Sequence, residues 1–95
     1  MHERRLIAEL IRTVEEVAAV SGASRVTRVS VWLGALSHFT PDHFREHFAD
    51  AAVGTVAERA EVDAAQDDDI PDPRAADVVL ESVEVETSAT AESRS

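Results

Sequence analysis

The 95-residue sequence contains no cysteine, no lysine and no tyrosine. Without cysteine the chain can form neither disulfides nor thiolate metal sites, and it has no thiol nucleophile. Without lysine it lacks the lysine of nucleotide-binding P-loops and any side-chain amine for Schiff-base chemistry. It also shows no Ser-His-Asp signature and no glycine-rich phosphate loop. Since several enzyme classes are thereby excluded, we expect a protein that is not an enzyme.

Aromatic residues make up only 4% of the chain, although 44% of it is hydrophobic. The core must therefore be built mainly from Val, Leu, Ile and Ala. A small domain of this kind rarely encloses a deep active site, which favours a binding or carrier role. Basic residues are scarce too, because 9 arginines face 19 acidic residues and the formal charge is −10. Such a chain is repelled by nucleic acids and anionic membranes, so we expect neither as a partner.

The first 20 residues interleave charged and apolar side chains, unlike a signal peptide or a membrane span. We therefore expect a cytoplasmic protein. The mature chain should begin at Met1, because His2 is too large for routine removal of the initiator methionine. Apolar residues three and four positions apart predict a helix that ends at Ser21-Gly22. Its apolar stripe comprises Leu6, Ile7, Leu10, Ile11, Val14, Val17 and Ala18.

Residues 25–33 are rich in β-branched side chains and alternate in polarity, which predicts a strand. The odd-numbered positions from Val29 to Leu33 form its apolar face, and Trp32 lies on the opposite face. Trp32 either marks a contact surface or is covered by a helix, and the size of its apolar ring favours the second interpretation.

A second helix is predicted to begin at Thr40-Pro41, with Thr40 as the N-cap, and to end at Gly54. Phe39 before the cap and Phe44 inside the helix fit a hydrophobic staple. The side chains expected on the buried face of this helix are Phe44, Phe48 and Ala52.

Residues 60–64 alternate as a short strand, and 66–77 form a loop because three adjacent acids and two prolines cannot continue a sheet. Residues 78–86 return to a strand. Leu80 and Val83 are three positions apart, so in a regular strand their side chains would point to opposite faces. This spacing predicts either a bulge or burial on both faces of the strand.

The predicted order is α-β-α-β-β, an α/β (α+β) fold with two helices packed on one face of a small three-stranded mixed sheet. We assign residues 1–87 to this domain and expect residues 88–95 to be a disordered tail, since they lack apolar anchors.

The most informative residues are Met1, His2 and Glu3. A histidine at position two can bind a metal together with the main chain, because the terminal amine, the His2 amide nitrogen and the His2 Nδ1 close two adjacent chelate rings. Three nitrogens in one plane suit Ni(II) or Cu(II) better than tetrahedral Zn(II). The fourth position stays open for Glu3, for another histidine or for a ligand from a partner.

The Met-His-Glu start followed by an amphipathic helix resembles the HypA/HybF family of hydrogenase nickel-incorporation proteins. The resemblance continues through RVTRVSVWLGALS (25–37), PDHF (41–44), Gly54-Thr55 and LESVEVE (80–86). It implies a nickel metallochaperone whose nickel ligand is His2, followed by Glu3. It also implies delivery of Ni(II), with a HypB-like GTPase as partner, to the large subunit of a nickel-iron hydrogenase.

The chain departs from this family in one large respect. Family members carry a zinc module with two Cys-x-x-Cys pairs between the last two strands. Here that position holds only the 67–73 loop, so we expect a nickel-binding domain without zinc. The alternative is a paralogue of the same fold that acts as a metal-independent, protein-binding adaptor.

His43-Phe-Arg-Glu-His47 also spells the inverted zinc-peptidase motif, in which two histidines one helical turn apart can hold one metal. A small metallohydrolase using His43, Glu46 and His47 would need a further carboxylate ligand and a substrate cleft, for which so small a domain has little room. We therefore interpret the pair as partly exposed histidines beside buried phenylalanines. His38 is expected in a loop, as a candidate fourth nickel ligand.

The three adjacent acids at 67–69 lack the spacing and the closing glutamate of a calcium loop, and they are expected to be solvated.

Overall fold

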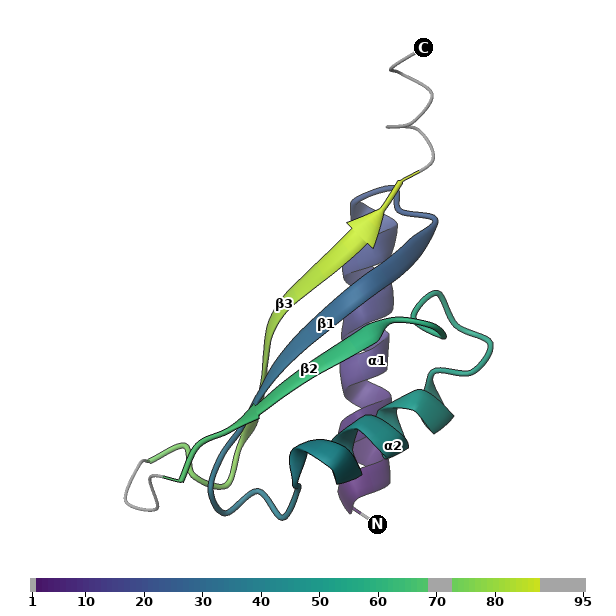
Figure 1. The fold of residues 1–95 in the computed structure, drawn as a ribbon. Coiled ribbons are helices and arrows are strands. Elements are labelled where there is room, and N and C mark those ends of the chain that lie inside the picture. Colours follow the sequence, from purple (N-terminus) through teal and green to yellow (C-terminus); the bar gives the residue numbers. More distant parts are fainter. Residues whose placement is uncertain (1, 69–72, 88–95) are drawn as a thin grey trace.

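The computed structural model describes residues 2–68 and 73–87 and contains two helices and a three-stranded sheet (Figure 1). The elements in chain order are helix α1 (His2–Val20), strand β1 (Arg25–Leu33), helix α2 (Pro41–Ala51), strand β2 (Glu61–Gln66) and strand β3 (Val78–Glu86). The predicted order α-β-α-β-β is confirmed. The predicted tail, 88–95, lies outside the described residues, as do residues 69–72 of the predicted loop.

The central strand of the sheet is β1, which pairs with β2 on one side and β3 on the other. The β1–β2 pair is parallel and the β1–β3 pair is antiparallel, so the sheet is mixed as predicted. Parallel neighbours cannot be joined by a tight hairpin, because the chain must cross back to the end where β1 began. Helix α2 lies in this crossover connection. The parallel pairing of β1 and β2 therefore accounts for the long connection in which α2 lies.

Two irregularities in the β1–β3 pairing bring the apolar side chains of both strands onto one face. The pairing skips Thr27 in β1 and Glu81 in β3. Each skipped residue reverses the alternation of side chains between the two faces. Leu80 therefore shares a face with Val83, and both pack against the core. Of the two alternatives left open by the sequence, the structure contains the bulge.

One continuous core fills the space between the two helices and one face of the sheet. Its buried members are Ile7, Ile11, Val14, Ala18, Val26, Val29, Val31, Leu33, Phe39, Phe44, Phe48, Ala52 and Ala57. The predicted packing of both helices on one sheet face is thus confirmed. Among the described residues, no helix combines the length and apolar character needed to cross a bilayer.

No helix of the described residues covers the opposite face of the sheet, where Trp32 lies. Its ring is partly exposed, and the guanidinium carbon of Arg74 lies 4.7 Å from the ring centroid. Our prediction that a helix covers Trp32 is therefore wrong. Both helices pack on the face that carries Val31 and Leu33, and strand geometry places Trp32 on the other one.

The start of α2 has the predicted cap and staple. The Thr40 hydroxyl accepts a hydrogen bond from the His43 N–H at 3.2 Å, and Pro41 opens the helix. The rings of Phe39 and Phe44 meet edge to face with centroids 5.5 Å apart. This staple sets the direction in which the chain enters α2, and so positions the rest of the helix against α1.

Three details differ from the sequence predictions. Helix α2 ends at Ala51 rather than at Gly54, which instead adopts a φ of 82° in the turn that follows. Strand β2 covers 61–66 rather than 60–64, because its pairing with β1 continues to the end of that strand. Val17 was expected in the apolar stripe but is 37% exposed, since the buried line along α1 is narrower than the stripe.

Gly34 lies where β1 leaves the sheet, in close contact with the turn before β3. Its N–H donates to the Asp77 carbonyl at 2.9 Å, and the Leu36 N–H donates to the Ala75 carbonyl at 2.6 Å. A Cβ on residue 34 would lie only 2.2 Å from the Ala75 carbonyl oxygen. We expect Gly34→Ala to lower the free energy of unfolding by about 1–3 kcal/mol, since a backbone segment must move. Urea unfolding monitored by circular dichroism measures this, and an unchanged midpoint would contradict the close contact.

Candidate metal site

Helix α1 begins at His2, so the Met-His-Glu sequence leads directly into the first helical turn. Met1 and the side chains of His2 and Glu3 lie outside what the structure describes. The chelate predicted for these three residues therefore stays a prediction. The backbone still bears on it, because the first N–H groups of a helix have no acceptor within the helix. The His2 amide nitrogen is thus not required by the hydrogen bonds of α1.

The first turns of α1 lie against α2, which crosses that end of the helix (Figure 1). Three residues of each helix line an open groove of about 480 Å³ between them. The lining residues are Arg4, Ile7, Ala8, His47, Asp50 and Ala51. Arg4 is only two residues beyond His2, which is about 3 Å along a helix axis. The groove therefore adjoins the turn that carries the predicted chelate.

The histidines of α2 lie together, as their spacing predicts. The ring centroids of His43 and His47 are 4.4 Å apart, with the ring planes at 70°. The Phe39 ring lies 5.6 Å from that of His43. Both histidines are partly exposed, whereas Phe44 and Phe48 are buried on the neighbouring face of the helix. The predicted arrangement of exposed histidines beside buried phenylalanines is confirmed.

A metallohydrolase built on these histidines gains no support from the geometry. Glu46 is exposed. Among the side chains that the structure describes, in residues 4–68 and 73–87, no group of three or more from His, Asp and Glu is placed to hold one metal ion. The third protein ligand that the peptidase motif requires is therefore not found among these residues.

His38 lies in the loop between β1 and α2, as predicted. It is exposed and has a φ of 70°, in the left-handed region that most side chains avoid. Its role as a fourth nickel ligand stays a prediction. In contrast, His47 shares a groove with Arg4, near the start of α1. The sequence alone does not predict this proximity. The spacing of His47, Asp50 and Ala51 places them on one face of a helix, but it does not show which other helix that face contacts.

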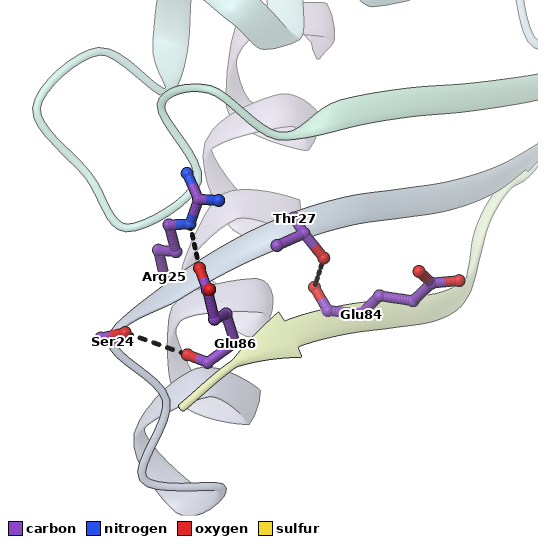
Figure 2. A network of polar contacts seen from close by, with 5 residues as sticks. All are labelled: Ser24, Arg25, Thr27, Glu84 and Glu86. Atoms are coloured by element: carbon purple, nitrogen blue, oxygen red, sulfur yellow. Dashed lines mark hydrogen bonds and ion pairs between the residues drawn. The ribbon is translucent and has the colours of Figure 1, made fainter. Parts of the chain in front are cut away.

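The far end of the sheet carries a polar network with a structural role (Figure 2). The Arg25 Nε donates to the Glu86 carboxylate, and the Ser24 hydroxyl donates to the Glu86 carbonyl at 3.1 Å. The Thr27 hydroxyl donates to the Glu84 carbonyl at 3.1 Å, beside the first irregularity of the ladder. The Arg25–Glu86 pair is more than half exposed, so it contributes at most about 1 kcal/mol. These contacts join the start of β1 to the end of β3, away from the N-terminal turn.

A family model described as "Hydrogenase/urease nickel incorporation, metallochaperone, hypA" matches residues 1–69. The hydrogenase maturation factor HypA of Chlorobium limicola is 40% identical over 63 residues, which are 66% of this chain and 54% of the relative. HypA 1 of Bradyrhizobium diazoefficiens is 45% identical over 60 residues, 63% of this chain and 53% of the relative. The chain thus spans about half the length of these relatives.

Two solved structures have the same fold. The solution structure of the Ni metallochaperone HypA from Helicobacter pylori superposes with a TM-score of 0.74 at 19% identity, covering 90% of this chain and 97% of the other. A second solution structure, of a protein named HypA, gives a TM-score of 0.71 at 21% identity, with 90% and 96% covered. At these identities the likeness concerns the fold.

Proposed function

The chain belongs to the HypA family of hydrogenase and urease nickel incorporation proteins, and from this membership we propose that it is a nickel metallochaperone for hydrogenase maturation. It binds Ni(II) at Met1, His2 and Glu3 and passes the ion to a partner protein. The observation that carries the proposal is the family match itself, which begins at the Met-His-Glu sequence and runs through β2. Matching relatives from two bacteria are named as hydrogenase maturation factors.

The chemistry of the N-terminus fits nickel as cargo. The Met1 amine, the His2 amide nitrogen and the His2 Nδ1 offer three nitrogens for a tetragonal ion such as Ni(II). Because α1 starts at His2, binding of nickel to the amide nitrogen would break no hydrogen bond of the helix. Glu3, His38 or a ligand from the partner would occupy the fourth position. Because the chain does not fill the coordination shell of the nickel ion, the partner protein can supply a ligand and take the ion.

We further propose that nickel binding in this chain does not depend on zinc. The chain has no cysteine, and only the 67–77 segment connects β2 to β3, where family members carry their zinc module. The family match ends at residue 69, inside this connection. A HypB-like GTPase and the large subunit of a nickel-iron hydrogenase are the proposed partners, and the cytoplasm is the proposed location. The chain itself is proposed to have no enzymatic activity.

Isothermal titration of the protein with Ni(II) tests the nickel proposal. With a free Met1 amine we expect a saturable binding event in which Zn(II) competes weakly, since planar nitrogen ligands favour Ni(II) over Zn(II). Unchanged Ni(II) binding in the presence of excess Zn(II) would support the chelate. Absence of heat and of retained nickel after gel filtration would contradict it.

One observation favours the alternative of a protein-binding adaptor. In the part of the chain that the structure describes, no helix packs on the sheet face that carries Trp32, and Val79 pairs with Trp32 across β1 and β3. A partly exposed tryptophan on an uncovered sheet face is a feature of protein contact surfaces. If the nickel titration fails, this adaptor function becomes the better interpretation.

A further inference from the structure

Two histidines that the proposed nickel site does not use lie one turn apart on α2. The ring centroids of His43 and His47 are separated by 4.4 Å, and neither residue is buried. Phe44 and Phe48, at 0% and 1% exposure, anchor the adjacent face of the same two turns in the core. The backbone that carries the two imidazoles is therefore held by packing and does not have to be ordered by a ligand.

This spacing has a specific chemical consequence. Side chains four residues apart lie on the same helix face, so two imidazoles can direct one nitrogen each at a single ion about 2.0–2.1 Å away. With centroids 4.4 Å apart, the two rings can turn one nitrogen each toward a shared ion by rotation about their side-chain torsions. Neutral imidazole is a good ligand for Zn(II), Cu(II) and Ni(II), and a poor one for Mg(II) or Ca(II).

The surroundings allow an ion to reach this pair. His47 lines the open groove of about 480 Å³ together with Asp50, whose carboxylate carries charge opposite to that of a cation. The chain as a whole has a formal charge of −10, which raises the local concentration of cations. Arg4, on the α1 side of the groove, carries a positive charge, which acts against the binding of a cation there.

We propose that His43 and His47 form a second metal site, which binds a divalent transition-metal ion such as Ni(II), Cu(II) or Zn(II). The pair supplies two ligands, and water fills the remaining positions, because no third His, Asp or Glu of the described residues is placed to join them. Such a site exchanges its ion readily. It lies beside the first turns of α1 but does not need the Met1 amine, so its existence does not rest on the proposed N-terminal chelate.

The test uses protein whose N-terminus is extended by a short tag and whose His2 is replaced (His2→Ala), so that the N-terminal chelate cannot form. Titration of this background with Ni(II) should show one remaining binding event. His43→Gln or His47→Gln should each weaken it by more than about tenfold, since even the loss of a residue that only orients a ligand costs that much. The double substitution should abolish it. Glu46→Gln, on the same two turns, is the matched control and should retain binding.

A second measurement identifies the ligands without any substitution in α2. In the extended His2→Ala protein, paramagnetic Ni(II) should broaden the imidazole NMR signals of His43 and His47 before that of His38. Equal binding by the double variant, broadening confined to His38, or no binding in this background would overturn the second site. These outcomes leave the N-terminal site untouched, because that site is measured on protein with a free Met1 amine.

Discussion

High-affinity binding of Ni(II) is expected to disappear when the Met1 amine is acetylated or extended, although every side chain of the protein remains. The reason is that, in the proposed chelate, the amine supplies one of three nitrogen ligands, and an amide formed from it no longer coordinates. His2→Ala should have the same effect, because it removes the imidazole and opens the second chelate ring. We expect each change to weaken binding by roughly a hundredfold or more, at the upper end of what the loss of a supporting residue costs. Titration of the three proteins side by side measures this.

The matched control is the same tag placed after Ser95, which leaves the amine free and should leave binding unchanged. His43→Gln/His47→Gln in the protein with a free terminus should also retain the high-affinity event. The planar complex should show a weak yellow absorption that is lost on acetylation. If the acetylated or His2→Ala protein binds nickel as tightly as its parent, the ligands are elsewhere and the adaptor function is favoured.

Phe44→Ala is expected to be the most damaging single substitution for the fold. The Phe44 side chain is fully buried between the rings of Phe39 and Phe48, with centroids 5.5 and 5.9 Å away. Removing a buried ring loses its transfer free energy and leaves a cavity, at a cost of about 3–5 kcal/mol. A small domain has only about 5–15 kcal/mol of total stability, so much of it is lost. Urea unfolding monitored by circular dichroism measures the difference.

Val53→Ala is the matched control, because Val53 is apolar, close in sequence and 65% exposed. It should change stability by no more than about 0.5 kcal/mol. Similar unfolding midpoints for the two variants would mean that Phe44 does not join α2 to the core.

Much of this fold could be predicted from the sequence, because the interactions that start a helix and set its periodicity involve residues close together in the chain. Thr40 followed by Pro41 marks a helix start through a cap and a fixed φ, and both are present. The regular spacing from Ile7 to Ala18 follows helix geometry whatever the helix packs on. The nickel hypothesis could also be made from the sequence, since the proposed chelate would use the backbone of the first residues and would need no tertiary contact.

Other features were decided only when separate elements met. Trp32 has the same local pattern whether a helix covers its face or not, and only the packing of both helices on the other face left it partly exposed. Val17 belongs to the apolar stripe, but the packing of α1 leaves this side chain 37% exposed. The groove that joins His47 to Arg4 depends on the angle at which α2 crosses α1. Spacing within one helix determines which residues share a face, but the fold determines what that face meets.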